Sequence, residues 1–563
     1  MKRRLMILLV AASCGSDVDS PDTQPDAGRP AAPDAGGPGR DAGTDEMPPD
    51  AALPDAAPAD AAAPAPDAAP AEPTIESVET SDGYMQARQG ESVELVITGQ
   101  NLAGVTNVVV GELGIADTVA TSGEIRVWVL VPHGAAPGPR DVMVNGLDGA
   151  DTERNAIEVT PYVVTPVLVP RGGHGTFQSP LRLCDEQIET ARAGDTILLL
   201  AGQHICQERV DLHEGGQIVQ GQGRATTIIG QRDRDFPGFE IRPAAFSPTT
   251  TTFRDFSMQT VPPVGRAAMD LIGGGALIVE RVDSNGPAIK IGGGCRICEK
   301  SVTVRESSFL GAGIDAAGLS RVEVFDSTFT QAAADVGIHA NGGRVSITRT
   351  TFDRCTVGVH LTKGETEAAQ VEIRNSVFTD TGISMRAGRL AIMDSSMTDS
   401  RSSDQFGRSI SIDGEGELEA TRVSIARIGG SGIEAFVSAA QPGSARVSLN
   451  EVLIEGGHYG VRLHGSSEGG GLFMTSSIVR NQTVAAVSYG FANARHDFRG
   501  GNQLSVVSGV ALEDARIDPL VAEPIPAAGI LLNGKAPPPG VVQGQAERPP
   551  DYRIVDPRSA IEF

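Results

Sequence analysis

Aromatic residues are scarce in this chain: they make up 4% of its 563 residues, with one Trp and five Tyr. Enzymes with deep apolar pockets usually carry more aromatic surface, so the composition argues against such a pocket. Apolar runs long enough to span a bilayer are missing from the sequence, which excludes a polytopic membrane protein. Basic residues are outnumbered, because 46 Lys and Arg face 71 Asp and Glu, for a formal net charge of −25. This balance argues against binding nucleic-acid phosphates or an anionic membrane surface.

Glycine and proline are abundant instead, with 68 Gly and 36 Pro. Helical bundles use less glycine, whereas short strands joined by many turns use both residues often. The length corresponds to three or four domains of ordinary size. We therefore expect an all-β chain with more than one folded unit.

The N-terminus has the pattern of an export signal. Positive Lys2–Arg4 precede a short apolar stretch, Leu5–Ala12. The next residues, ending at Cys14, resemble a bacterial lipobox, in which the cysteine is lipidated and becomes the new N-terminus. The alternative is ordinary cleavage after Ser13, because Ala-x-Ser also suits the general signal peptidase. Gly15 follows the cysteine, rather than the Asp that resembles an inner-membrane retention signal, so the resemblance implies an anchor in the outer membrane or at the cell surface.

The composition of residues 14–72 predicts a disordered tether, which follows a signal peptide at residues 1–13. The segment is rich in Pro, Ala and Asp, repeats the tripeptide Pro-Asp-Ala, and has almost no large apolar residues. It cannot bury enough apolar surface to offset the entropy lost on ordering. Its length would be at most roughly 180 Å in extended polyproline form and about 40 Å as a flexible coil. We expect the tether to hold the folded part away from the membrane.

Residues 73–162 alternate between apolar and polar positions with a period of two. Ser92–Ile97 and Ile125–Val129 are examples, and Gly, Asn and Pro separate such runs. Half-buried strands of this kind predict a small β-sandwich. The segment also resembles the IPT/TIG immunoglobulin-like family at Pro73–Val78, Gly99–Leu102, Val131-Pro132 and Pro137-Gly138. The resemblance implies a spacer or a binding module, in which Trp128 is either a surface for stacking sugars or a packing contact.

An internal repeat is the strongest signal in the remaining chain. Its template is two apolar residues five positions apart, and the second of them recurs every 19 to 29 residues. The pairs are Phe253…Met258, Leu277…Val282, Val304…Phe309, Val324…Phe329, Ile347…Phe352, Ile373…Phe378, Ile392…Met397, Ala420…Ile425, Leu449…Ile454 and Phe473…Ile478. A Gly-apolar-x-apolar segment follows most pairs, as at Gly337-Ile338. A repeat of this length cannot close a core alone, so it must stack on its neighbours as a parallel β-solenoid. Leucine-rich repeats share the period but need a recurring Leu/Asn frame that this sequence lacks.

These rungs resemble the right-handed β-helix repeats of pectin-lyase-like proteins, as in Val371–Phe378. An amphipathic segment at Leu181–Arg192 also looks like the helix that caps the N-terminal end in that family. The resemblance covers roughly residues 165–520. It implies a right-handed parallel β-helix with an N-terminal capping helix over 163–545, followed by a C-terminal tail at 546–563.

Cysteine usage agrees with export. Cys184 on the expected capping helix and Cys206 on the rung beneath could form a disulfide that staples the cap. Cys295 and Cys298 could be a redox pair or half of a zinc site, but no second pair of ligands completes a metal cage, and a structural loop disulfide fits better. We expect Cys355 to be buried between rungs as a small apolar residue.

In the strand after each glycine, the apolar residues point inward and the residue between them points outward. The outward position, taken rung by rung, holds Asp270, Lys290, Asp315, His339, His360, Ser384, Ser411, Glu434, Arg462 and Ser488. With rungs about 4.8 Å apart, these residues would form one polar row. The candidates for a ligand face are Lys290, Asp315, His339, His360, Glu434 and Arg462. A polar row is also what any solvated solenoid face carries, and that interpretation stays open.

Catalysis finds less support. Consecutive Asp315, His339 and His360 would suit acid–base chemistry or a metal. However, polygalacturonase-like hydrolases carry several Asp in the turn before this strand, whereas Asp335 and Asp380 stand alone here. The Trp-Ile-Asp-His element of pectate lyases and the Asp-Pro-His-Asp element of alginate epimerases are missing from the sequence. No carboxylate cluster marks a Ca²⁺ site, so we assign no catalytic residue, metal or other cofactor.

Two functions of different class follow. The first is a monomeric, non-catalytic surface lipoprotein whose β-helix presents a polar face to polysaccharide or to another cell-surface component. It would contact the membrane through its lipid and would not bind nucleic acid. The second is a polysaccharide lyase or glycoside hydrolase with an unfamiliar site. Scarce aromatics and missing enzyme motifs favour the first, whereas the Asp and His residues of the polar row support the second.

Overall fold

The computed structural model describes most of the chain after residue 70. The described residues are 71–166, 173–206, 209–231, 238–243, 249–260, 267–286, 288–292, 298–311, 313–318, 320–331, 336–364, 367–399, 407–437, 444–465, 470–490, 495–514, 530–532, 535 and 552–554. The expected leader, Cys14, nearly all of the tether and Cys295 lie outside these residues. No helix within them is long and apolar enough to cross a membrane.

Two four-stranded sheets make up the first folded part. One contains β1 (Thr74–Thr80), β3 (Ser92–Gln100), β6 (Glu124–Leu130) and β5 (Gly114–Ala120). The other contains β2 (Gln86–Arg88), β8 (Gly149–Thr160), β7 (Gly138–Gly146) and β4 (Val105–Val110), and a short 3-10 helix, η1 (Leu102–Gly104), precedes β4. Alternation along β6 explains the core: Ile125 and Val127 are fully buried, whereas Arg126 between them is exposed. Membership of the IPT/TIG family stays a prediction.

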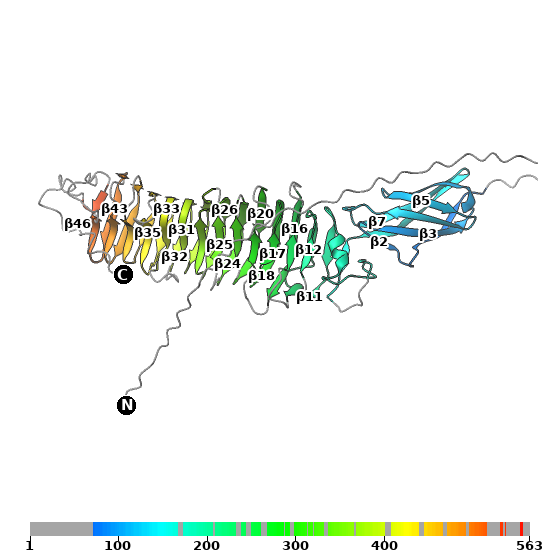
Figure 1. Ribbon diagram of the computed structural model, residues 1–563, viewed down its shortest axis with the longest axis horizontal. Coiled ribbons are helices and arrows are strands. Elements are labelled where there is room, and N and C mark those ends of the chain that lie inside the picture. Colours follow the sequence, from blue (N-terminus) through cyan, green and yellow to red (C-terminus); the bar gives the residue numbers. More distant parts are fainter. Residues whose placement is uncertain are drawn as a thin grey trace, which may run out of the picture. The chain divides into compact units, whose positions relative to one another are not determined.

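The described residues between 162 and 554 form a right-handed parallel β-helix, whose strands are stacked from β12 to β46 (Figure 1). Each strand pairs in parallel with the equivalent strand of the next rung, which gives three sheets. Sheet 1 contains β12 (Val210–Leu212), β15 (Phe239–Ile241), β17 (Ala267–Leu271), β19 (Ala288–Ile291), β22 (Ile314–Ala317), β25 (Val336–Asn341), β28 (Val357–Thr362), β31 (Ile383–Met393), β33 (Ile410–Thr421), β35 (Ser431–Val437), β38 (Tyr459–Gly465), β41 (Ala485–Tyr489), β44 (Val510–Asp514) and β46 (Tyr552–Ile554).

Sheets 2 and 3 complete each rung. Sheet 2 contains β9 (Tyr162–Val164), β10 (Thr196–Leu199), β13 (Ile218–Gly221), β16 (Thr250–Thr260), β18 (Gly275–Asn285), β20 (Lys300–Arg305), β23 (Ser320–Phe325), β26 (Arg344–Thr348), β29 (Gln370–Arg374), the second halves of β31 and β33, β36 (Ala445–Asn450), β39 (Gly471–Thr475) and β42 (Arg495–Arg499). Sheet 3 contains β11 (Gly202–Cys206), β14 (Thr227–Gln231), the second halves of β16 and β18, β21 (Ser308–Leu310), β24 (Thr328–Thr330), β27 (Thr351–Asp353), β30 (Val377–Thr379), β32 (Ser396–Thr398), β34 (Ser424–Ala426), β37 (Leu453–Glu455), β40 (Ile478–Gln482), β43 (Asn502–Val506) and β45 (Ile530–Leu532).

A stack of phenylalanines fills part of the β-helix core, as the repeat predicts. Phe309, Phe329, Phe352 and Phe378 lie opposite one another on successive rungs of sheet 3 and are at most 1% exposed. Their ring centroids are 4.7–5.0 Å apart and neighbouring rings are within 9° of parallel. The inward register of these rungs is therefore confirmed.

Buried hydroxyl groups line the corner between sheets 2 and 3 and form hydrogen bonds with its backbone. We call them the hydroxyl ladder: Ser307, Ser327, Thr350, Ser376, Ser395 and Ser477. Each hydroxyl donates to the carbonyl oxygen two residues earlier, at 2.7–3.1 Å. Most also accept a backbone N–H of the preceding rung, at 3.1–3.3 Å. The small polar residue inside the repeat thus satisfies buried backbone groups that would otherwise be costly.

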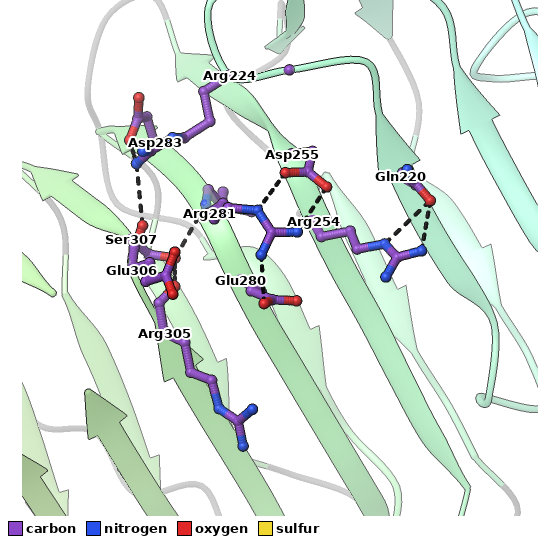
Figure 2. Close-up of polar contacts among 12 residues, drawn as sticks. Gln220, Arg224, Arg254, Asp255, Glu280, Arg281, Asp283, Arg305, Glu306 and Ser307 are labelled. Atoms are coloured by element: carbon purple, nitrogen blue, oxygen red, sulfur yellow. Dashed lines mark hydrogen bonds and ion pairs between the residues drawn. The ribbon is translucent and has the colours of Figure 1, made fainter. Parts of the chain in front are cut away.

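A charged row lies on the outside of the same corner, and its members have positive φ. They are Asp255, Arg281, Glu306, Asp326, Arg349, Asp394, Arg422 and Glu451. Arg281 donates to both carboxylate oxygens of Asp255, at 2.6 and 3.0 Å, and to Glu280 at 2.5 Å (Figure 2). The hydrogen bonds between Arg281 and Asp255 lower the pKa of Asp255. Arg349 binds Asp326 of the preceding rung in the same way. Because several of these charges pair with one another between rungs, we interpret the row as structural.

The predicted repeat slips at two rungs. Met474 and Val479 fill the core where the template chose Phe473 and Ile478, whose side chains are only partly buried. At the second rung, Ser284 rather than Val282 lies opposite Phe309. The two-residue template picks the larger apolar residue at each position. The register of a strand, however, depends on how all strands of its rung pair with the next rung.

Both ends of the β-helix also differ from the prediction. The expected helix over Leu181–Arg192 is reduced to a 3-10 helix, η2 (Glu186–Thr190). Asp185 and Asp195 accept local backbone N–H groups, which compete with helical hydrogen bonds. At the other end, the predicted tail at 546–563 contributes β46, which pairs with β44 and so extends sheet 1.

Disulfide bonds are present among the described residues. Cys184 and Cys298 are each disulfide-bonded, and their pairing with Cys206 and Cys295 stays a prediction. Cys355 is 2% exposed, as expected, and its thiol lies 3.5 Å from the carbonyl oxygen of Phe329.

Candidate functional site

One column of outward side chains runs along sheet 1, and we call it the polar column. Strand pairing places Asp270, Lys290, Asp315, His339, His360, Ser384, Ser411, Glu434, Arg462 and Ser488 opposite one another on successive rungs. The column continues to Asp211 and Glu240 at one end, and to Glu513 and Arg553 at the other. These four residues were not predicted from the sequence, although each lies between two apolar residues or beside one. The structure thus aligns all six ligand-face candidates.

Exposure divides the polar column into sections. Near its start, Glu240 is 3% exposed and binds Arg209 at 2.6 Å. The middle section, Lys290 to Ser384, is exposed or partly exposed. Beyond it, Ser411, Ser488 and Glu513 are nearly buried. A ligand therefore has access to the middle section, which spans about 19 Å at 4.8 Å for each rung.

His339 lies at the centre of the middle section and is held from two sides. Its Nδ1 lies 3.0 Å from Oδ1 of Asp315, and its Nε2 lies 3.3 Å from the hydroxyl of Thr362. That hydroxyl donates to Asn341 at 3.2 Å. About half of the Asp315 side chain and a third of the His339 side chain remain exposed. The ring is thus oriented in advance, with polar edges that a ligand can reach.

His360 supports His339 from the next rung. The two rings lie 5.3 Å apart at an interplanar angle of 29°. The pKa of His360 is lowered to about 4, chiefly by burial and also by the charges of His339 and Arg386, while a hydrogen bond with the Ser384 backbone opposes the shift. At neutral pH His360 is therefore a neutral imidazole, which offers hydrogen bonds to hydroxyl groups rather than a positive charge.

Asp270 is the most unusual carboxyl group of the column. Burial raises its pKa, the charge of Lys290 opposes this, and Glu240 adds to it. Its Oδ1 is buried and has no hydrogen-bond partner within the described residues. Sequence analysis placed Asp270 in the row but did not single it out, because no sequence signal reports burial of an outward position.

Glu434 is correctly placed in register, but it is not presented to solvent as a ligand-face residue would be. It is 3% exposed, and it binds His464 at 3.0 Å and Arg408 at 3.2 Å. Burial acts to raise the pKa of Glu434, but the His464 hydrogen bond and the Arg408 charge outweigh it, so the pKa is lowered. Arg462 lies 3.9 Å from Glu434, with its guanidinium 4.6 Å from the ring centre of Tyr459. Neighbouring long side chains cover the carboxylate, which sequence periodicity does not reveal.

No group of three or more His, Cys, Asp or Glu side chains among the described residues could hold a metal ion. In the accessible part of the polar column, the Asp315–His339 contact and the neighbouring Asp270 are the candidates for acid–base chemistry. The arrangement otherwise offers evenly spaced hydrogen-bonding groups on a rigid sheet.

Comparisons with known proteins give a likeness in fold. No family model and no curated protein matches the sequence. Among solved structures, the catalytic domain of a GH87 α-1,3-glucanase in complex with tetrasaccharides aligns with a TM-score of 0.37 at 11% identity, covering 86% of this chain and 98% of that chain. Bacteriophage CBA120 tailspike protein 3 aligns with a TM-score of 0.42 at 15% identity, covering 73% and 64%. The mannuronan C-5 epimerase A-module of Azotobacter vinelandii aligns at 0.27 and 12%, covering 56% and 90%. These scores are low, so the site must be interpreted from its own geometry.

Proposed function

We propose that the middle section of the polar column binds an extended polysaccharide without cleaving it. The observation that carries this proposal is the unbroken register of Lys290, Asp315, His339 and His360 on adjacent rungs. Groups fixed at even spacing suit a polymer with a repeating unit, and their rigidity lowers the ordering cost of binding.

The charge of the section favours a neutral or amino-sugar polymer. Lys290 and Asp315 have opposite charges, and His360 is neutral at neutral pH. The chain as a whole carries a formal net charge of −25, which repels strongly anionic glycans. Hydrogen bonds to sugar hydroxyls would therefore supply most of the affinity.

Binding to soluble and insoluble polysaccharides tests the proposal. We expect His339→Ala/His360→Ala to weaken binding roughly tenfold or more, because each lost hydrogen bond removes about 0.5–1.5 kcal/mol. Arg321→Ala/Arg344→Ala is the matched control, since both side chains are exposed on sheet 2. Equal binding by wild type and the histidine variant would contradict the proposal.

A glycoside hydrolase is the second candidate, and Asp270 favours it. A carboxyl group with a raised pKa can act as a general acid, and Asp315 lies two rungs away, at about 9.6 Å. This is near the separation that inverting glycosidases use. Release of reducing ends by the wild type, but not by Asp270→Asn, would select this function over simple binding.

We also propose that the mature chain is anchored at the cell surface by lipid on Cys14, which the leader and the acidic tether support. The Cys14→Ala protein is expected to move from the membrane fraction to the soluble fraction. Mass spectrometry of the mature N-terminus gives the direct measurement. An unmodified N-terminus at another residue would exclude the anchor.

A further inference from the structure

An exposed phenylalanine lies beside the polar column, in the part where the column itself is covered. Phe436 belongs to β35, which is labelled in Figure 1. It lies between Ala435 and Val437, which are fully buried, so its ring points away from the core. It is 37% exposed. A single exposed ring is common on a protein surface, so the significance of Phe436 depends on the groups that surround it.

Phe436 belongs to a second outward row, which we call the outer row. Its members are Asp413, Phe436 and His464, which pair with one another on successive rungs of β33, β35 and β38. The carboxylate and the imidazole therefore flank the ring along the β-helix axis, each about 4.8 Å away along the sheet. Each member lies two residues beyond a member of the polar column.

A buried carboxylate holds this arrangement in place. The rings of Phe436 and His464 lie 4.9 Å apart at 41°. His464 is bound through Nε2 to Glu434, and Ser431 donates to the same carboxylate at 2.8 Å. Because Glu434 is nearly fully buried, His464 has little freedom, and Phe436 rests against a fixed ring. A ligand would lose little entropy in ordering this surface.

The charges around the ring are balanced. Arg408 lies 3.6 Å from Asp413 and 3.2 Å from Glu434, and Arg462 lies on the other side of Glu434. Two carboxylates thus face two guanidinium groups. Such a surface offers hydrogen bonds of both polarities without attracting either sign of charge strongly, which fits an uncharged polyhydroxylated ligand.

We infer that Phe436, together with Asp413 and His464, forms a subsite for one neutral sugar ring of a glycan. The apolar face of a pyranose packs on the phenyl ring, and its hydroxyls reach Asp413, His464 and Arg462. This inference rests on the proposed function and extends it, because it gives the covered part of the column a contact that the column itself lacks. Glu434 is three rungs beyond His360, about 14 Å, so one extended chain can reach both sites.

Titration with neutral hexasaccharides of the gluco, xylo and N-acetyl-chito series tests the subsite on the full chain. We expect Phe436→Ala to weaken binding about tenfold and Phe436→Tyr to retain it, because tyrosine keeps the ring. Phe177→Ala is the matched control, since Phe177 is also an exposed phenylalanine, at 45%, but lies outside sheet 1. Sugar C–H protons should shift upfield by NMR with the wild type and not with Phe436→Leu, which reports stacking directly.

The outcomes separate the two proposals. If His339→Ala/His360→Ala loses binding while Phe436→Ala binds like the wild type and no ring-current shift is seen, the subsite is wrong and the proposed function stands. If the ring-current shift persists while the histidine variant binds normally, the subsite is right and the middle section is not the main contact. If no hexasaccharide binds to the wild type, both proposals are overturned.

Discussion

Replacing Phe352 by alanine is expected to lower the free energy of unfolding by about 3–5 kcal/mol. The ring is fully buried and lies between Phe329 and Phe378, with centroids 5.0 and 4.7 Å away. Removing it loses the transfer free energy of the side chain and leaves a cavity between two rings that the rungs above and below hold in place. Its neighbours cannot collapse inward without breaking their own strand pairing, so the cost should fall near the upper end.

Denaturant unfolding followed by circular dichroism measures this change. Val377→Ala is the control, because Val377 is on the next rung of the same sheet but is 41% exposed. A surface substitution of this kind should change the free energy of unfolding by about 0.5 kcal/mol or less. Equal effects of the two substitutions on the free energy of unfolding would mean that the phenylalanine stack does not stabilise the core.

Glu434→Gln is expected to lower the free energy of unfolding by about 3 kcal/mol at pH 7. Glutamine keeps the shape but removes the charge, which leaves Arg408 and His464 beside a neutral amide. We expect the lower end of the range for a broken buried ion pair, because these partners keep some solvent access, with 16% and 33% of their side chains exposed. Glu419→Gln is the control, since Glu419 and Arg389 form an exposed pair worth about 0.5 kcal/mol or less.

The Glu434 prediction also has a pH dependence. The pKa of this carboxyl is lowered in the folded chain from its ordinary value of 4.5. Its contribution to stability is therefore fully present above pH 4.5 and is lost as the pH falls through the folded pKa. The difference in melting temperature between wild type and Glu434→Gln should be constant near neutral pH and should shrink on acidification below pH 4.5. A difference that grows in acid would contradict the proposed ion pairs.

Much of the fold could be predicted because the β-helix repeats one local pattern. Inward residues such as Phe329 and outward residues such as His339 alternate along short strands, and the same spacing returns at every rung. Register along the axis follows once each rung is aligned with its neighbours. The slips at Phe473 and Ile478 occurred where a large apolar residue lies one position before the true core residue.

Exposure along the polar column could not be predicted in the same way. Alternation of apolar and polar residues indicates that a side chain points outward from the sheet, but it does not indicate whether other side chains cover it. Glu434 is covered because Arg408, His464 and Arg462 gather over it, and all three come from neighbouring rungs. Phe436 was missed for a different reason: it lies one residue past the apolar-x-apolar pattern, where the template assigned no role.

The hydroxyl ladder constrains how this chain can change its length over evolution. Most of the buried hydroxyls link their own rung to the one before it, so an insertion within a strand would separate donor from acceptor and move every later core residue to the wrong face. Duplicating or deleting a complete rung leaves those links intact and adds or removes one position in the polar column. Adding whole rungs would lengthen the surface that a polymer can contact, without changing the spacing between its polar side chains. The length of this surface and the identity of its side chains could therefore vary independently.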